Sequence, residues 1–428
     1  MLFCNIDLLD EKFETKRNQY VGVKDGRIAY IGASAPEEDF GERYDGRHRL
    51  LMPAFYNVHS HAPMTLLRGY AENLPLQRWL GEKVFPFEDQ IDDEAAYYGT
   101  LLAISEMLAS GTASFSDMYF FSGGMVPAIL ESGIKCNLSR GLTVFDDSDY
   151  TDLPAYRDNV RLRGEWNGAN NGRLIGDLCI HGEYTSNPKI VEAVAQHARE
   201  TGARIQIHLS ETKTEHEECK GRHGLTPAAY MEKHGIFDSP TTAAHCVWLE
   251  DEDFDILKRH GVTVACCPAS NLKLASGYAN VPKMLESGIN VALGTDGAAS
   301  NNNLNIMQDM YLFGVVYKGY FRDPTIITPA EVLHAATRAG ALSQGRDDSG
   351  LLAVGMRADL CVLNTDTPQF TPMTSAACNV VYAAQGADIR MTMVDGEVLY
   401  RDGEFKTIDI EKVKAEVQRR TDSILSRL

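Results

Sequence analysis

The feature that most constrains the fold is a repeated alternation of strand-like and helix-like stretches across residues 53–349. An apolar run that ends at His59 is the first strand candidate. Seven more follow, over residues 112–117, 135–142, 173–180, 204–209, 242–247, 262–267 and 290–293. Helical stretches lie between them, such as 94–110, which is followed by Gly111 as helices often are. Eight β/α units of this total length predict an α/β protein built on a (β/α)8 TIM barrel.

The two ends of the chain follow a different pattern, with short strands and tight turns. An Asp-Gly pair at residues 25–26 joins two apolar runs, and the same arrangement recurs at 395–396, which is typical of β-hairpins. We therefore expect the two ends to form one small β-sandwich domain. The predicted organisation is a first sandwich part (1–53), the barrel (54–349), and a second sandwich part with an amphipathic C-terminal helix (350–428).

Charge and composition limit the range of partners. The formal net charge of −18 disfavours nucleic acid, because phosphate binding requires clustered Lys and Arg. No stretch approaches the roughly 18 apolar residues of a membrane-spanning helix. The nine cysteines are scattered without a CxxC pair, as expected for reduced thiols. We expect a cytoplasmic protein that binds neither nucleic acid nor a membrane, and the sequence allows a homo-oligomer.

Two histidines at i and i+2 end the first strand candidate. Because side chains two residues apart on a strand share a face, His59 and His61 can reach the same metal ion. In a TIM barrel the catalytic groups lie at the C-terminal ends of the strands. Three more polar groups occupy such ends, namely His208, His245 and Asp296.

Together these groups match the nitrogen and oxygen donors of a catalytic divalent metal with one position left for water. A lone histidine at a strand end is more often a hydrogen-bonded core residue, so the interpretation depends on the whole set. The expected ligands of one metal ion are His59, His61, His208 and Asp296. His245 and Glu211 are expected beside the water. Zn²⁺ is the ion we expect, with Fe, Mn and Ni as alternatives.

The glycines on both sides of Asp296 are expected to let the backbone turn sharply at the end of the last strand.

The chain resembles the amidohydrolase superfamily, and within it the S-adenosylhomocysteine/5′-methylthioadenosine deaminase branch, which is related to triazine hydrolases. The resemblance covers nearly the whole chain, and its most specific segments are MPAFYNVHSHAPMTLLRG, IHLSET, AAHCVWL, PASNLKLASG and LGTDGAASNNNLN. It implies a barrel with an attached β-sandwich. The implied activity converts the 6-amino group of an adenine nucleoside to a 6-oxo group with release of ammonia. Candidate substrates are S-adenosylhomocysteine, 5′-methylthioadenosine, 5′-deoxyadenosine and adenosine.

The resemblance also implies catalytic roles and a metal count. Glu211 would move a proton from water to N1 of the purine, while His245 and Asp296 would assist the attacking oxygen. Family members with two metals usually carry a carboxylated lysine at the end of the fourth strand. Residues 173–181 contain no lysine, so a single metal ion is expected.

Substrate-binding positions follow from the same resemblance. Trp79 would line the nucleoside pocket, Glu88 would bind the ribose hydroxyls, and His181 and Glu211 would contact the substrate. Physically, these residue types suit stacking on a ring and accepting hydroxyl protons.

Arg140 matches an arginine that meets the amino-acid carboxylate of S-adenosylhomocysteine. The position of a second such arginine holds Ala155 here, and Arg157 is two residues away. A shift of two residues on a helix changes the face that a side chain occupies. Substrates without a carboxylate need no such clamp.

Two other functions remain as alternatives. One is a related hydrolase acting on guanine, a triazine or another substituted heterocycle, and the other is a metal-free protein of the same fold.

The segment His181-Gly182-Glu183 matches half of the cytidine-deaminase zinc signature, but the PCxxC half is absent.

Overall fold

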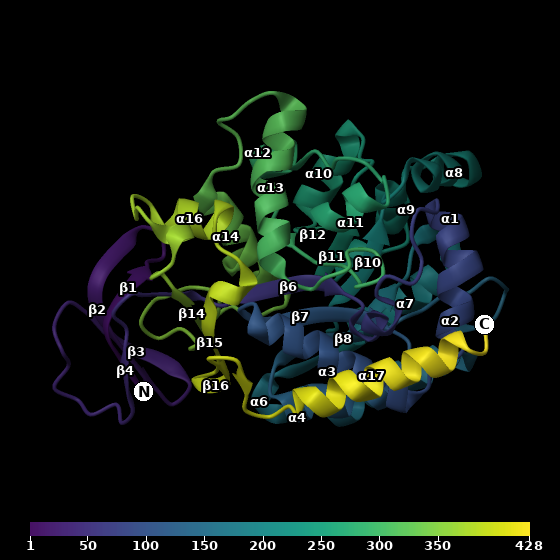
Figure 1. Ribbon diagram of the computed structural model, residues 1–428. Coiled ribbons are helices and arrows are strands. Elements are labelled where there is room, and N and C mark those ends of the chain that lie inside the picture. Colours follow the sequence, from purple (N-terminus) through teal and green to yellow (C-terminus); the bar gives the residue numbers. More distant parts are fainter.

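The computed structural model describes residues 1–428, and an eight-stranded parallel sheet forms its centre (Figure 1). The strands are neighbours in chain order, and each adjacent pair is parallel. They are β6 (Phe55–Ser60), β7 (Thr112–Tyr119), β8 (Lys135–Arg140), β9 (Leu174–Ile180), β10 (Ile205–Leu209), β11 (Thr241–His245), β12 (Thr263–Cys266) and β13 (Val291–Leu293). The predicted TIM-barrel fold is confirmed.

Helices follow the strands as the alternating pattern predicts. The main ones are α3 (Asp93–Ala109), α4 (Ser122–Ser132), α5 (Pro154–Arg161), α7 (Pro188–Thr201), α8 (Lys213–His223), α10 (Asp251–Arg259), α12 (Val281–Glu286), α13 (Ile306–Phe321), α14 (Pro329–Ala336) and α15 (Arg338–Ser343). None of the helices is long and apolar enough to span a lipid bilayer.

Hydrogen bonds at the edge between the last and first strands close the barrel. The backbone N–H of Asp296 donates to the carbonyl of His59 at 3.0 Å. The side chain of Asn57 accepts from the backbone N–H of Thr295 at 3.0 Å and donates to its hydroxyl at 2.7 Å. A Cβ at Gly294 would lie 2.8 Å from the Cβ of His59, so this close approach requires glycine.

The two ends of the chain combine into one mixed sheet of nine strands, which confirms the expected small β-domain. The strands are β1 (Leu2–Leu9), β2 (Thr15–Lys24), β3 (Arg27–Gly32), β4 (Arg43–Asp45), β5 (Arg49–Pro53), β14 (Leu360–Asn364), β15 (Ile389–Val394), β16 (Glu397–Arg401) and β17 (Glu404–Phe405). Antiparallel pairing of β5 with β14 joins the two halves. One residue after β5, the chain enters the barrel as β6.

Both predicted hairpins are present in this sheet. Asp25 and Gly26 connect β2 to β3 with φ values of 51° and 74°, and Asp395 and Gly396 connect β15 to β16 with 47° and 79°. Positive φ at both central residues is what a two-residue hairpin turn needs, and Asp-Gly tolerates it.

The C-terminal helix α17 (Ile410–Leu425) returns to the barrel and lies along α3 (Figure 1). Its buried side chains are those of Val413, Val417, Arg420 and Ile424. Arg420 forms an ion pair with Glu94 at 2.6 Å. The sequence pattern therefore predicted the helix, and its apolar side packs against the protein.

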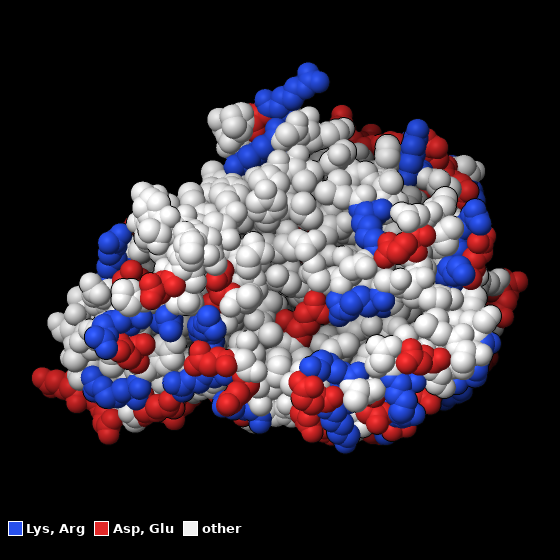
Figure 2. Space-filling model, viewed as in Figure 1, with Lys and Arg blue, Asp and Glu red and all other residues white.

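Charged side chains are unevenly spread over the face in Figure 2. Acidic and basic groups are intermixed over the terminal sheet and α17, whereas a stretch over α13, α14 and α16 (Ala376–Tyr382) carries few charges.

A buried ion pair connects the barrel to the terminal sheet. The ammonium of Lys135, on β8, lies 2.6 Å from the carboxylate of Asp359 and 2.7 Å from that of Asp395. Tyr56, on β6, donates its hydroxyl to Asp359. Burial alone would raise the pKa of Asp359, but Lys135 and these hydrogen bonds hold it below its usual value. The carboxylate of Asp359 is therefore charged, and Lys135 stabilises this buried charge.

We predict that Lys135→Met destabilises the protein strongly, because it leaves Asp359 charged and without its cation. The loss is about 3 kcal/mol, the usual result of breaking a buried pair. Thermal unfolding followed by circular dichroism measures it. Lys16→Met, which breaks a half-exposed ion pair on β2, is the control and should change the midpoint little. Equal shifts for the two variants would contradict a structural role for the buried pair.

Candidate active site

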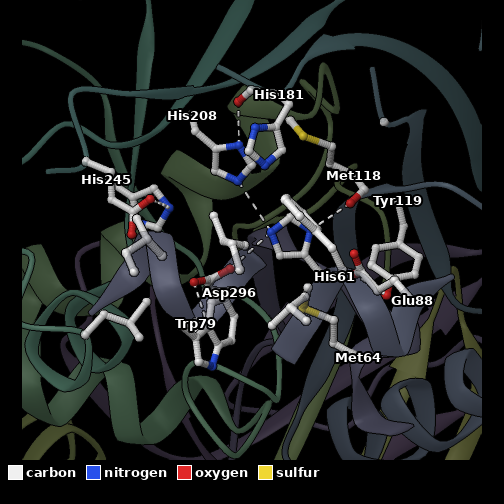
Figure 3. Close-up of a pocket in the computed structure, with 18 of the residues that line it drawn as sticks. His61, Met64, Trp79, Glu88, Met118, Tyr119, His181, His208, His245 and Asp296 are labelled. Atoms are coloured by element: carbon white, nitrogen blue, oxygen red, sulfur yellow. Dashed lines mark hydrogen bonds and ion pairs between the residues drawn. The ribbon is translucent and has the colours of Figure 1, made fainter. Parts of the chain in front are cut away.

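Five polar side chains from the ends of four barrel strands converge at the C-terminal end of the barrel. They are His59 of β6, His61 just after β6, His208 of β10, His245 of β11 and Asp296 just after β13, and all are buried. Figure 3 shows His61, His208, His245 and Asp296 among them. The Nε2 atoms of His61 and His208 are 3.4 Å apart, and the Nε2 of His61 is 3.2 Å from Oδ1 of Asp296. The structure thus brings together every metal-ligating residue that the sequence predicted.

Backbone carbonyls orient two of the rings. Nδ1 of His61 donates to the carbonyl of Met118 at 2.7 Å, and Nδ1 of His208 donates to the carbonyl of His181 at 2.6 Å. A ring that donates through Nδ1 leaves the lone pair of Nε2 free to bind a cation. Both Nε2 atoms face the centre of the cluster.

The donor set fits a metal ion. Nε2 of His59 is buried, has no hydrogen-bond partner and lies 3.6 Å from Oδ1 of Asp296. Ligand atoms within 4.8 Å of one another form two overlapping groups, His59–His208–His245 and His59–His61–Asp296. Imidazole nitrogens and one carboxylate are typical of a catalytic zinc site. These side chains are therefore placed so that they could hold a metal ion.

Protonation of the rings supports this interpretation. Burial lowers the pKa of His59 to about 4 and that of His208 well below its usual value, so both rings are neutral near pH 7. Burial also opposes protonation of His61, but the adjacent Asp296 raises its pKa to about 9. A cation bound between His61 and Asp296 would replace that proton, so metal binding should release it.

The backbone turns sharply where the strands end, but the glycines beside Asp296 do not make the turn. Asp296 itself has a φ of 59°, and His245 and Ser210 have 72° and 48°. Such left-handed residues are uncommon and cluster at functional sites. Gly294 and Gly297 instead allow close packing, since a Cβ at Gly297 would lie 2.6 Å from the sulfur of Met64. The sequence-based explanation of these glycines was therefore wrong.

A second layer of polar groups holds the acidic and basic side chains in place. Oδ2 of Asp296 accepts hydrogen bonds from the hydroxyls of Ser300, at 2.7 Å, and Ser270. Nδ1 of His245 donates to the side-chain oxygen of Asn271 at 2.8 Å. Sequence analysis assigned no role to these residues, although Ser270 and Asn271 lie within PASNLKLASG and Ser300 within LGTDGAASNNNLN, two of the most specific segments.

Glu211 lies beside the metal cluster, two residues after β10. Its Oε2 is 3.9 Å from Nε2 of His245, and Ser276 donates to its Oε1 at 3.3 Å. Burial raises the pKa of Glu211 above its usual value. A buried carboxyl group with a raised pKa is a better proton acceptor than an exposed one, which suits a general base.

A pocket (Figure 3) extends from this cluster and is lined by four of the predicted substrate residues, namely Trp79, Glu88, His181 and Glu211. Trp79 ends helix α1 (Leu76–Trp79), and its indole N–H donates to the carbonyl of Ala71 at 3.0 Å. Glu88 ends α2 (Phe85–Glu88) and accepts from the hydroxyl of Tyr119 at 2.6 Å. Figure 3 shows Glu88 and His245 on opposite sides, with Asp296 between them. His181 also lines the pocket.

Arg140 does not line this pocket. It lines a neighbouring recess, where its Nε donates to Oδ2 of Asp158 at 3.0 Å. Ala155 is buried in α5, and Arg157 on the same helix is exposed. Arg140 therefore lies outside the pocket and shares this recess with Glu88 alone among the predicted substrate residues.

Comparisons with known proteins identify the family of this chain. A model of the amidohydrolase family matches residues 50–399. A 5-methylthioadenosine/S-adenosylhomocysteine deaminase of Syntrophomonas wolfei is 40% identical over 412 residues, which is 95% of each chain. A 5′-deoxyadenosine deaminase of Methanothermobacter thermautotrophicus is 39% identical over 393 residues, 92% of each chain. The crystal structure of a Xanthomonas campestris adenosine deaminase with bound zinc has a TM-score of 0.92 at 27% identity, and covers 99% of this chain and 98% of its own.

We predict that Gly294→Ala weakens metal binding while the protein remains folded. The added methyl group meets His59 at the strand end, which moves one predicted ligand away from Asp296. A loss of zinc affinity of about tenfold or more is expected, as for other disturbances around metal ligands. Competition with a chromophoric chelator measures it. Gly221→Ala, on α8 with open space around the new methyl group, is the control. Unchanged affinity in Gly294→Ala would refute this role.

Proposed function

Because this chain belongs to the amidohydrolase family, we propose that it is a deaminase that replaces the 6-amino group of adenine nucleosides with oxygen from water. The observation that supports this most is one pocket with Glu211 and His245 at one end, Glu88 at the other end and Asp296 between them. The first end suits attack by water on a ring carbon, and the second suits the hydroxyls of a ribose. Relatives named as deaminases of such nucleosides support the same class.

One divalent ion is proposed as the cofactor, with His59, His61, His208 and Asp296 as its ligands. Zinc is favoured, because the donor set suits it and the similar Xanthomonas campestris enzyme binds zinc. When bound, the ion would make a water molecule acidic enough to react near neutral pH.

Glu211 is proposed to carry the proton. Its buried carboxylate takes one proton from the attacking water and delivers it to N1 of the purine, which makes C6 more electrophilic. The raised pKa of Glu211 makes its carboxylate a better acceptor for the proton of water. Oxygen then adds at C6 as a hydroxyl group. The proton of that hydroxyl passes to the amino nitrogen as the bond from C6 to this nitrogen breaks, so ammonia leaves and the 6-oxo group remains.

His245 and Asp296 are proposed to hold the attacking oxygen. Because Asn271 fixes Nδ1 of His245, its Nε2 points toward Glu211 and the cluster centre. Asp296 is held by two serine hydroxyls on Oδ2, which leaves Oδ1 directed at the histidines. Neither side chain has to reorganise as charge develops, which lowers the barrier.

Substrate orientation is proposed to come from the opposite wall. Glu88 accepts hydrogen bonds from the ribose hydroxyls, and Trp79 and His181 border the space for the nucleoside. Candidate substrates are 5′-methylthioadenosine, S-adenosylhomocysteine, 5′-deoxyadenosine and adenosine.

An ultraviolet assay of the zinc-loaded protein tests the proposed class. The adenine absorbance of at least one of these nucleosides should fall as it is deaminated. The ultraviolet spectra of guanine and of a triazine should not change. Turnover of guanine or a triazine alone would contradict the proposal and favour the alternative hydrolase.

We predict that Glu211→Gln keeps bound zinc but loses turnover by about 10²–10⁴-fold, the usual contribution of a general acid or base. Metal analysis and ammonia release measure the two properties. Glu217→Gln, at an exposed position on α8, is the control and should leave both unchanged. A Glu211→Gln enzyme with wild-type turnover would remove the proton-transfer role.

We predict a pH-dependent KM from Glu88. Burial raises its pKa to about 7, although Tyr119 opposes this, so Glu88 becomes neutral as the pH falls. If only the carboxylate holds the ribose, KM should rise about tenfold from pH 8 to pH 6. A 2′,3′-dideoxynucleoside lacks the hydroxyls and should not show this rise. Parallel KM profiles for the two substrates would contradict the assignment.

A further inference from the structure

A second recess opens directly beside the pocket and has a volume of about 480 Å³. Phe85, Glu88 and Phe120 border both spaces. In the proposed binding mode the purine lies at the metal end and the ribose at Glu88. A group attached at the 5′ carbon therefore extends past Glu88 into this recess, whose other walls include Phe121, Arg140 and Phe145.

The only cation lining this recess is already paired. The Nε of Arg140 donates to Asp158, its Nη1 donates to the carbonyl of Gly141, and its guanidinium lies 5.3 Å from the centre of the Phe120 ring. Asp158 approaches from α5, which passes behind Arg140. The positive charge is therefore neutralised before any ligand enters.

The other charged side chains that line the recess are acidic. Glu88 and Asp89 line it, while α5 presents Ala155 as a buried residue and Arg157 as an exposed one. A ligand carboxylate would thus meet two acidic side chains and an arginine that must first leave Asp158. An apolar substituent would meet four phenylalanine rings, and sulfur packs favourably against such rings.

We propose that this recess is a subsite for an uncharged, apolar 5′ substituent, such as a methylthio group, and that Asp158 sets this preference by holding Arg140. Asp158 acts through Arg140 and does not touch the substrate. The inference rests on the proposed deaminase function and narrows its substrate class.

The test compares kcat/KM for 5′-methylthioadenosine and S-adenosylhomocysteine in the zinc-loaded enzyme. The wild type should prefer 5′-methylthioadenosine by about tenfold or more, because the carboxylate of the zwitterionic homocysteine group finds no unpaired cation in the recess. Asp158→Asn frees Arg140 and should shift the ratio toward S-adenosylhomocysteine by about tenfold, the value of one charge-assisted hydrogen bond. Dissociation constants measured in Glu211→Gln and in Glu211→Gln/Asp158→Asn should shift in the same direction.

Asp238→Asn is the matched control, because it breaks another half-exposed Asp–Arg pair away from the recess. It should leave the substrate ratio unchanged. Equal use of both substrates by the wild type, or an unchanged ratio in Asp158→Asn, would overturn the subsite while leaving the deaminase intact. No turnover of any nucleoside would instead overturn the proposed function and the subsite with it.

Discussion

The hydrogen bond from the backbone of Asp296 to the carbonyl of His59 is the contact on which the rest of the structure depends. It closes the barrel between the last and first strands, and it joins two of the proposed metal ligands. Gly294 permits this approach because any side chain there would strike His59. The same few atoms thus complete the fold and place a carboxylate against two imidazoles. This coupling explains why the site lies at this edge of the barrel.

Burial determines the chemistry of the groups gathered there. It keeps two histidines neutral, as metal ligands must be, and raises the pKa of Glu211 toward the range of a proton carrier. The polar groups around them limit the cost of that burial. Ser270 and Ser300 hold Asp296, and Asn271 holds His245, so the reactive atoms face the pocket without competing partners. A preorganised arrangement of this kind is what lowers a reaction barrier.

Much of the fold and of the site could be predicted from the sequence. The spacing of apolar residues indicates strands and helices, and the place of a histidine at the end of a strand indicates the rim of the barrel. Alternating strand and helix patterns gave the barrel, and histidines at strand ends could be placed on one rim before their distances were known. Contacts that depend on tertiary structure could not be predicted. The left-handed backbone of Asp296 is stabilised by its surroundings, whereas local propensity favoured its neighbouring glycines. The pairing of Arg140 with Asp158 joins a strand to a helix 18 residues later, and no local pattern signals it.

The central claim is that water replaces the 6-amino group of an adenine nucleoside at this site. Mass spectrometry of the products formed from 5′-methylthioadenosine in heavy-oxygen water tests it most directly. The account predicts a 6-oxo nucleoside that carries one heavy oxygen atom, together with an equal amount of ammonia. Release of free adenine, which would indicate cleavage of the bond to the ribose, or recovery of unlabelled starting nucleoside would contradict it.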